Sequence, residues 1–436
     1  MEFELDSGNT AWMIMASSLV LLMTPGLAFF YGGMVRGKSV LNMMMMSFSA
    51  IGVAGLIWVL YGYSLTFGTD IGGIIGNPAD FFGLAISDSE SLMASSGVPA
   101  TVAAGFQGTF AIITVALISG AIADRAKFGT WIAFAAIWVT LVYSPMAHMV
   151  WGGGLLGGDG ITAALSTPID FAGGTVVHIN AGAAGLALAL VLGKRKGFGT
   201  EPIRPHNLPF VMLGAALLWF GWFGFNAGSE FAADGTAGRA WVNTLVATGV
   251  AMLAWLATEK FRDGHATSLG AASGVVAGLV AITPAAAAVD TWGSIGIGVV
   301  AGILCALAVG LKYRFGFDDS LDVVGVHLVG GLVGTVLIGL FATDNAESFG
   351  VWYPDGALNG LFYGGGVTQL LTQIIVALVA VAFSFVATYL IGLLLKVTMG
   401  WRVSQEDEVG GIDLAVHGET AYETISQGSV IKEVRA

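Results

Sequence analysis

Charged side chains are scarce in this sequence. Asp, Glu, Lys and Arg make up 11% of its 436 residues, whereas a typical soluble domain carries roughly 25%, so most of the chain cannot face water. The sequence has a single cysteine, Cys305, which lies within an apolar run. This excludes disulfides and cysteine-based metal sites. Basic residues number 17 against 29 acidic ones, and this excess of negative charge argues against nucleic-acid binding.

Apolar runs, in contrast, recur from one end of the chain to the other. A run of about 20 apolar residues crosses the ~30 Å hydrocarbon core of a bilayer as a helix, and the 65 glycines let such helices pack closely. The pattern predicts an all-α integral membrane protein with eleven transmembrane helices, at 11–33, 40–66, 99–123, 129–151, 171–193, 208–228, 240–259, 266–287, 291–311, 323–342 and about 360–397.

The basic residues fall on one side of this arrangement. If every second loop is cytoplasmic, Arg239 is the only basic residue on the outer side. Because Lys and Arg are retained in cytoplasmic loops, the N-terminus is predicted outside and the C-terminus inside. The 16 basic residues on the inner side are Arg36, Lys38, Arg125, Lys127, Lys194, Arg195, Lys196, Arg204, Lys260, Arg262, Lys312, Arg314, Lys396, Arg402, Lys432 and Arg435.

The fifth and tenth predicted helices share a pattern. Each has a histidine followed by glycines four and seven residues later, at 178–185 and 327–334, with an aspartate shortly before it, Asp170 or Asp322. A unit of five spans makes the next unit enter the membrane from the opposite side, and such inverted repeats place the substrate path at the midplane between the halves. We expect repeat one at about 11–193, repeat two at about 208–342 and a long C-terminal helix at about 360–397, forming a transmembrane domain of residues 1–398 that precedes a cytoplasmic regulatory tail, 399–436.

Two of the six histidines, His178 and His327, fall well inside predicted spans. One interpretation is a packing histidine bonded to a carbonyl. The other is a pathway, since ionisable groups inside membranes line substrate routes or relay protons, and imidazole titrates nearest neutrality. A facing pair that shares one proton suits a small neutral solute better than a permanent cation. A metal site would need further ligands at the same depth, so we expect no metal and no cofactor.

Asp170 and the aromatic residues near the helix ends have two interpretations each, and Asp322 has one. Asp170 and Asp322 can cap the N-termini of their helices, and Asp170 can also attract a cation. The aromatic residues can form an interfacial belt or a cation–π cage that replaces the hydration of a small cation. In the second case Ser229 would accept a hydrogen bond from that cation. The aromatic residues are Phe106, Phe110, Trp151, Trp222 and Phe225.

Six stretches spread over nearly the whole chain carry a family resemblance. They are Gln107-Gly-Thr-Phe110-Ala, His148-Met-Val-Trp151-Gly-Gly-Gly, Asp170-Phe-Ala-Gly-Gly-Thr-Val-Val-His178-Ile-Asn-Ala-Gly, Trp222-Phe-Gly-Phe225-Asn-Ala-Gly-Ser229, Asp322-Val-Val-Gly-Val-His327 and Val416-His-Gly-Glu-Thr420-Ala-Tyr. Together they resemble the ammonium transporters of the Amt/Mep/Rh superfamily, and the bacterial and archaeal Amt proteins in particular.

The resemblance implies a homotrimer in the cell membrane with one pore inside each subunit. It also implies a cytoplasmic tail that can dock a PII-type signal protein, with Thr420 as a regulatory threonine. The implied external binding site consists of Phe106, Phe110, Trp151, Ser229 and Asp170, and the implied pore residues are His178, His327, Phe225, Trp222 and Thr283.

The expected function is therefore ammonium transport, with methylammonium as a second candidate substrate. Ammonium would bind at the external aromatic site and lose a proton, and ammonia would pass the histidine pair, with or without separate proton transfer. An enzyme is not expected, because an intramembrane hydrolase needs a nucleophile beside its histidine and no Ser or Cys motif accompanies His178 or His327. The alternative is an ammonium sensor that signals through the cytoplasmic tail.

Overall fold

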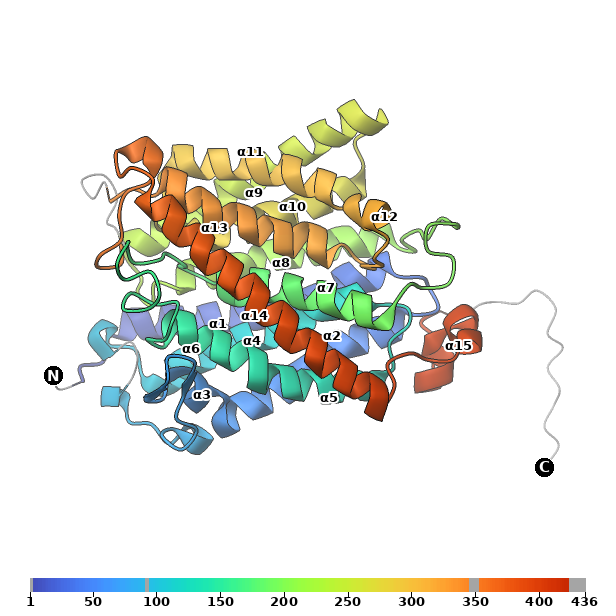
Figure 1. Ribbon diagram of the computed structural model, residues 1–436, viewed down its shortest axis with the longest axis horizontal. Helices are drawn as coiled ribbons and strands as arrows, with labels where there is room; N and C mark the ends of the chain where they lie inside the picture. Colours follow the sequence, from blue (N-terminus) through green and yellow to red (C-terminus); the bar gives the residue numbers. More distant parts are fainter. Residues whose placement is uncertain (1–2, 91–93, 345–352, 423–436) are drawn as a thin grey trace.

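The computed structural model describes residues 3–90, 94–344 and 353–422. Within these ranges, eleven helices are long and apolar enough to cross a membrane, which confirms the predicted eleven-helix, all-α membrane protein. They run side by side along the long axis of the molecule (Figure 1). The predicted inner-side residues Lys432 and Arg435 lie outside the described residues.

Several spans are assembled from shorter helical pieces. The eleven spans are Ser7–Met34, Val40–Phe67, Ala100–Ile122, Phe128–Trp151, Gly174–Leu192, Leu208–Gly228, Gly235–Asp263, Ser268–Ala285, Thr291–Phe315, Val324–Phe341 and Thr368–Thr398. The elements are α1 (Ser7–Met34), α2 (Val40–Ile57), η1 (Trp58–Gly62), α3 (Tyr63–Phe67), β1 (Asp70–Ile71), β2 (Ile75–Gly76), η2 (Phe82–Leu84), η3 (Asp88–Glu90), η4 (Ala94–Ser96), α4 (Ala100–Ile118), η5 (Ser119–Ile122), α5 (Phe128–Trp138), η6 (Val139–Tyr143), α6 (Ser144–Trp151), η7 (Gly174–Ile179), α7 (Asn180–Leu192), α8 (Leu208–Gly228), α9 (Gly235–Asp263), α10 (Ser268–Ile282), η8 (Thr283–Ala285), α11 (Thr291–Ala308), α12 (Leu311–Phe315), η9 (Val324–Leu328), α13 (Val329–Phe341), η11 (Leu361–Tyr363), α14 (Thr368–Thr398), α15 (Gln405–Gly410) and η12 (Asp413–His417).

Caps and loop glycines account for three of the differences between predicted and observed span starts. Helix α1 begins at Ser7 because the Asp6 carboxylate accepts a hydrogen bond from the Asn9 amide, 2.8 Å away. Helix α9 begins at Gly235 because Asp234 caps it in the same way. Helix α14 begins at Thr368 rather than near 360, because Gly364 and Gly366 before it adopt positive φ angles that a helix cannot include.

The two ends of the bundle differ in what they carry. The chain enters α1 at one end, which we name the N-side, and α15 lies at the opposite end, the tail side (Figure 1). Helix α14 runs obliquely across the bundle and packs on α7, α13 and α5.

The two histidine helices have matching features where they meet. The segments before α7 and α13, η7 and η9, are both π-helical and each carries the histidine. A Cβ on Gly182 would lie 2.4 Å from the amide nitrogen of Leu328, next to His327, and a Cβ on Gly331 would lie 3.1 Å from Cβ of His178. The absence of a side chain at each glycine therefore lets the segment around the histidine of the other repeat pack closely against it. This reciprocity explains why the same spacing of histidine and glycine recurs in both helices.

The capping aspartate of the second repeat is Asp319, and the prediction that Asp322 caps this helix was wrong. The Asp319 carboxylate accepts hydrogen bonds from the amides of Val323 and Val324 at 3.1 and 2.7 Å. Asp322 has a φ of 63° and forms an ion pair with Lys312 at 2.7 Å. Lys312 lies on α12, so this partner could not be read from the tenth span alone.

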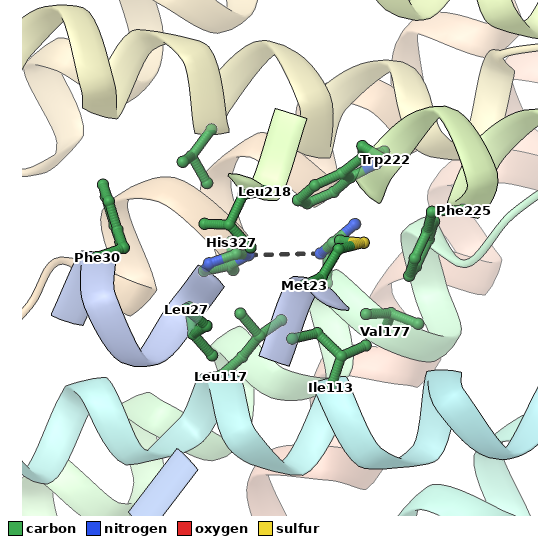
Figure 2. A pocket seen from close by; sticks show the side chains of 12 residues that line it. Met23, Leu27, Phe30, Ile113, Leu117, Val177, Leu218, Trp222, Phe225 and His327 are labelled. Carbon is green, nitrogen blue, oxygen red and sulfur yellow. Dashed lines mark hydrogen bonds between the residues drawn. The ribbon is translucent and has the colours of Figure 1, made fainter. Parts of the chain in front are cut away.

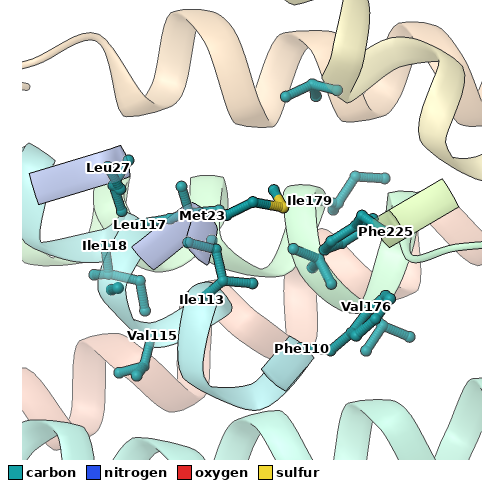
Figure 3. Close-up of a cluster of buried hydrophobic side chains, with 14 of the residues drawn as sticks. Met23, Leu27, Phe110, Ile113, Val115, Leu117, Ile118, Val176, Ile179 and Phe225 are labelled. Atoms are coloured by element: carbon teal, nitrogen blue, oxygen red, sulfur yellow. The ribbon is translucent and has the colours of Figure 1, made fainter. Parts of the chain in front are cut away.

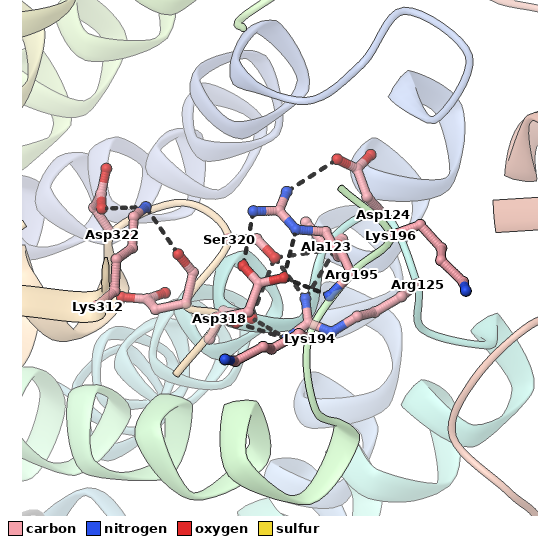
Figure 4. A network of polar contacts seen from close by, with 12 residues as sticks. Ala123, Asp124, Arg125, Lys194, Arg195, Lys196, Lys312, Asp318, Ser320 and Asp322 are labelled. Carbon is pink, nitrogen blue, oxygen red and sulfur yellow. Dashed lines mark hydrogen bonds and ion pairs between the residues drawn. The ribbon is translucent and has the colours of Figure 1, made fainter. Parts of the chain in front are cut away.

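A buried polar network joins the two repeats at the tail side (Figure 4). Arg195, which follows α7, forms ion pairs with Asp124 at 3.1 Å and with Asp318 at 2.9 Å. Arg125 donates to the Ser320 hydroxyl at 2.6 Å. Because Asp318 and Ser320 belong to the second repeat, the network fixes one repeat to the other.

The tail is attached to the same region. The Val403 amide donates to the backbone oxygen of Arg125 at 3.1 Å. Glu408 on α15 forms an ion pair with Arg402 and accepts from the Lys196 amide. Displacement of the tail would therefore break contacts with residues that also connect the repeats.

Candidate functional site

A vestibule opens at the N-side of the bundle. Its volume is about 260 Å³, and its lining includes four of the residues expected in an external site: Phe110, Trp151, Asp170 and Ser229. These residues come from α4, α6, the segment before η7 and the end of α8. The fold thus gathers side chains that are far apart in the sequence around one opening.

The lining of the vestibule includes aromatic rings and a hydroxyl group. Trp151 lies edge-on to Phe110, with ring centroids 6.1 Å apart, and its indole N–H donates to the backbone oxygen of Asp170 at 3.0 Å. The Ser229 hydroxyl donates to the backbone oxygen of Phe225 at 2.8 Å. Since its proton is used inside the helix, its lone pairs are free to accept from a donor in the vestibule.

Asp170 is a buried carboxylate at the N-terminus of η7. It accepts from the amides of Gly173, Gly174 and Thr175 at 2.6–2.8 Å, and also from the Thr175 hydroxyl. Gly173 has a φ of 111°, a conformation that favours glycine and lets the amides converge. Burial raises the pKa of the Asp170 carboxyl, and these hydrogen bonds oppose the rise. The structure therefore gives Asp170 a capping role, with its charge at the vestibule wall.

Two stacked phenyl rings close the inner end of the vestibule. The centroids of Phe110 and Phe225 lie 4.1 Å apart with an interplanar angle of 25°, and both rings are buried. Apolar side chains of α1, α4 and η7 surround them (Figure 3). The rings therefore lie between the vestibule, which Phe110 lines, and the cavity that Phe225 lines.

Beyond the phenyl rings lies a small apolar cavity with the histidine pair. Its volume is about 10 Å³, enough for roughly one water-sized molecule. The Nδ1 atoms of His178 and His327 are 3.4 Å apart (Figure 2). The lining consists of His178, His327, Trp222, Phe225, Met23, Leu27, Phe30, Ile113, Leu117, Val177, Leu218 and Val276.

The Nδ1–Nδ1 contact constrains the protons of the pair. One Nδ1 must donate and the other accept, so a neutral pair carries one proton between the rings. The accepting ring then has its own proton on Nε2, while the donating ring has a lone pair there. The pair consequently offers one donor and one acceptor to a molecule in the cavity, which matches the hydrogen bonding of ammonia or water.

Phe106 and Thr283 support the site from behind. Phe106 is fully buried and contacts Phe110, with centroids 4.9 Å apart, without lining the vestibule. Thr283 is also buried and accepts a hydrogen bond from the Trp222 indole at 2.8 Å. The Trp222 ring in turn stacks on His178, with centroids 5.4 Å apart.

Sequence reasoning missed Gln107 as a site residue. It lines the vestibule, and its buried Oε1 has no hydrogen-bond donor within the described part of the chain. An orphaned buried acceptor at a binding cavity suits a donor-rich ligand. Its signal in the sequence was the position three residues before Phe110, one helical turn away on the same face.

Thr420 lies on the tail side, far from the vestibule. It lines a cavity of about 520 Å³ together with Arg36, Lys38 and Asp413. The Asp413 carboxylate accepts from the first amides of α2, so it fastens the tail to the connection between the first two spans.

Comparisons with known proteins agree on one family. A model described as the Ammonium Transporter Family matches residues 11–422. The chain is 56% identical to the ammonium transporter of Mycobacterium tuberculosis over 98% of this chain and 92% of that protein. It resembles the crystal structure of Candida albicans Mep2 with a TM-score of 0.82 and 34% identity, over 93% of this chain and 88% of the other. A protein described as a sensor Amt protein gives a TM-score of 0.83 and 30% identity, over 94% of this chain and 98% of the other. The chain therefore belongs to the ammonium transporter family and is a multi-pass protein of the cell membrane.

Proposed function

We propose that this protein transports ammonium by binding the cation in the vestibule, removing a proton and conducting ammonia past the histidine pair. The observation that carries the proposal is the narrow apolar cavity of about 10 Å³ containing the His178–His327 contact, directly behind the stacked rings. Such a cavity admits a small neutral molecule and excludes a hydrated ion.

The vestibule supplies the binding step. Phe110 and Trp151 line the vestibule with aromatic rings, and a desolvated cation–π contact contributes about 2 kcal/mol or more. Ser229 and Gln107 offer oxygen acceptors for the N–H groups of ammonium, and potassium has no N–H group to donate to them. Asp170 adds negative charge at the wall. Phe106 acts through Phe110, whose ring it contacts.

The proton step gives selectivity against potassium. Transfer of an intact cation into an apolar cavity carries a large desolvation cost, and potassium has no proton to lose. The proton follows the histidine pair separately, giving net charge movement, or returns to the N-side, making the protein an ammonia channel. Trp222, held by Thr283, keeps the His178 ring in register for either route.

The sidedness follows from the charges. We propose that the N-side faces outward and the tail side faces the cytoplasm, because Arg36, Arg125, Arg195 and Arg402 all take part in the tail-side contacts. His178 and His327 are buried inside the helical bundle of a single subunit, which favours one pore in each subunit of the homotrimer that the family resemblance implies.

The tail is proposed to be regulatory. We assign residues 1–398 to the transmembrane domain and 399–436 to a cytoplasmic tail that docks a PII-type signal protein. Modification of Thr420, beside Arg36 and Lys38 in their shared cavity, would change the charge at the tail attachment. Methylammonium is the proposed alternative substrate, because it keeps N–H donors and a charge similar to that of ammonium.

A second candidate function is ammonium sensing through the tail. It is favoured by the similarity to the sensor Amt protein and by the tail contacts that reach Arg125 and Lys196. The two functions are separated by whether ammonium produces flux.

The test is an ammonium pulse on purified protein in liposomes on a solid-supported membrane, at fixed potassium and pH. His178→Ala and His327→Ala are compared with His265→Ala, which changes an exposed histidine whose ring contacts the Gly264 backbone oxygen. A transient current that is lost in the first two variants and kept in the control supports transport through the histidine pair.

The remaining outcomes are equally informative. Internal alkalinisation without current would indicate an ammonia channel. An unchanged current and ion selectivity in His327→Ala would exclude a proton relay through the pair. Absence of both current and alkalinisation from well-folded protein would favour the sensor.

A further inference from the structure

His148 joins the N-side end of α6 to the segment 66–76, which we name the N-side hairpin. The side chain is fully buried. Its Nδ1 lies 2.8 Å from the backbone oxygen of Thr66, and its Nε2 lies 2.8 Å from Oδ1 of Asp70. Both ring nitrogens therefore face oxygens that accept hydrogen bonds.

A neutral imidazole cannot serve both partners. It has one N–H and one lone pair, so one nitrogen would direct its lone pair at an oxygen lone pair. Either the ring is doubly protonated or the Asp70 carboxyl carries a proton. The Asp70 side chain is half-exposed to solvent and also accepts from the Gly73 amide at 2.8 Å, and both conditions favour the ionised carboxylate. The proton therefore belongs to the ring.

The other ionisable groups near His148 do not replace Asp70. Elements packed against α6 carry Tyr63 on α3, Tyr143 on η6 and His178 on η7. Asp80, beyond the hairpin, accepts from the Thr69 amide at 2.7 Å. Within the described ranges, the hydrogen bonds found for the His148 ring go to Thr66 and Asp70.

Backbone hydrogen bonds connect the turn that follows Trp151 to His148 and to the N-side hairpin. The backbone oxygen of His148 accepts from the amides of Gly152 and Gly154 at 2.9 and 3.1 Å. The Leu155 amide donates to Gly73 of the N-side hairpin at 2.8 Å. Trp151, three residues after His148, is thus held between the histidine, the hairpin and Asp170.

We propose that His148 is a positioning residue whose doubly protonated ring ties α6 to the N-side hairpin and so fixes Trp151 at the vestibule. The affinity for ammonium then falls as rising pH removes one of the two ring donors. This inference rests on the proposed function insofar as Trp151 contacts the cation, whereas the charge state of the ring can be tested independently.

The first test measures that charge state. Protein labelled with ¹⁵N in its histidine rings is studied in lipid by solid-state NMR, and a His148→Gln difference spectrum assigns the signal. Two protonated ring nitrogens are expected at about pH 6. A neutral ring at that pH would overturn the proposal, even if the protein transports no ammonium.

The second test uses Asp70→Asn, which exchanges an acceptor for a donor. The new amide can donate to Nε2 of a neutral ring while Nδ1–H still donates to Thr66, so this variant no longer needs the extra proton. It loses the hydrogen bond from the Gly73 amide, which uses the same carboxylate oxygen as His148. The matched control is Asp159→Asn, which removes an exposed carboxylate elsewhere in the N-side loops.

The readout is a ratio, the KM of wild type for ammonium divided by the KM of each variant at the same pH. The equilibrium between ammonium and ammonia changes both KM values equally, so its effect cancels in the ratio. For Asp70→Asn the ratio is expected to rise about two- to fivefold between about pH 6 and pH 8, the effect of weakening one cation–π contact. For Asp159→Asn it stays constant. A constant ratio for both variants would refute the coupling to Trp151, and absence of any wild-type current would refute the proposed function instead.

Discussion

Alanine at position 182 is expected to separate the two helices that carry the histidine pair. Its Cβ would lie 2.4 Å from the Leu328 amide nitrogen and 2.6 Å from the Cα and Cβ of the same residue. Ordinary van der Waals contacts begin at 3.4 Å, so η9 has to shift by about 1 Å, the difference between these distances. The neighbours are backbone atoms, which cannot rotate away.

The shift acts directly on the pore. A rigid movement of η9 would lengthen the 3.4 Å contact between His178 and His327 to about 4.4 Å, beyond hydrogen-bond distance. Overpacking costs about 1–3 kcal/mol, and the higher helix propensity of alanine offsets about 1 kcal/mol of this. The Gly182→Ala protein is therefore expected to fold with a modestly lower Tm and to lose most of its ammonium current.

The assay compares ammonium-induced current and Tm with those of Gly52→Ala. A Cβ at Gly52 meets no atom within 4 Å, so this control adds a methyl group to a transmembrane helix without a clash. If Gly182→Ala keeps the wild-type current and Tm, close approach of the repeats is not what sets the histidine pair.

Three further predictions concern buried or partly buried polar groups, each checked by thermal unfolding in detergent. Asp318→Asn weakens the partner of buried Arg195 and should destabilise the protein by about 3 kcal/mol. Although burial raises the pKa of Asp318, the hydrogen bond from Arg195 and nearby positive charges lower it overall. Its stabilisation is therefore present above the unfolded pKa of about 4 and lost at lower pH, so the Tm values of wild type and variant should converge in acid. Burial and the charge of Asp234 raise the pKa of Glu230 to about 8, so the folded state retains a proton that the unfolded state releases. Wild-type stability should fall as pH rises from about 4.5 to 8, and a pH dependence identical in Glu230→Gln would contradict this assignment. Thr283→Val leaves the Trp222 indole without its acceptor and should cost about 1–3 kcal/mol; an unchanged Tm and current would exclude a supporting role for Thr283.

The spans could be predicted because their signal is local. About 20 consecutive apolar residues identify a membrane helix whatever its neighbours are, and the eleven predicted spans correspond to the eleven observed ones. The missed boundaries depend on caps. Asp6 and Asp234 lie outside the apolar runs, and only the backbone geometry reveals which amides they accept from.

The misassigned aspartate shows a signal that was present but overlooked. Asp170 precedes His178 by eight residues, and Asp319 precedes His327 by the same interval. Asp322 looked more suitable because it directly precedes the apolar run. Its positive φ and its pairing with Lys312 depend on how the preceding loop folds back, which no periodicity encodes.

Some site residues could be identified from the sequence, and others became evident only in the structure. The sequence singled out His178 and His327 because ionisable side chains inside apolar runs are costly. It could not distinguish rings that line the vestibule, such as Phe110, from rings that support it, such as Phe106. Nor could it reveal Gln107 as an unpaired acceptor, because a missing hydrogen bond is a property of the whole neighbourhood.

The sequence by itself determined the membrane environment, the number of spans and the repeated His–Gly pattern, since each depends on the chemistry of one continuous segment. Only the tertiary structure decided that two imidazoles 149 residues apart meet at 3.4 Å behind a pair of stacked rings. That contact depends on how closely η7 and η9 approach. The approach is set by Gly182 and Gly331 packing against backbone of the opposite repeat, a relation between segments that becomes defined only when both are folded.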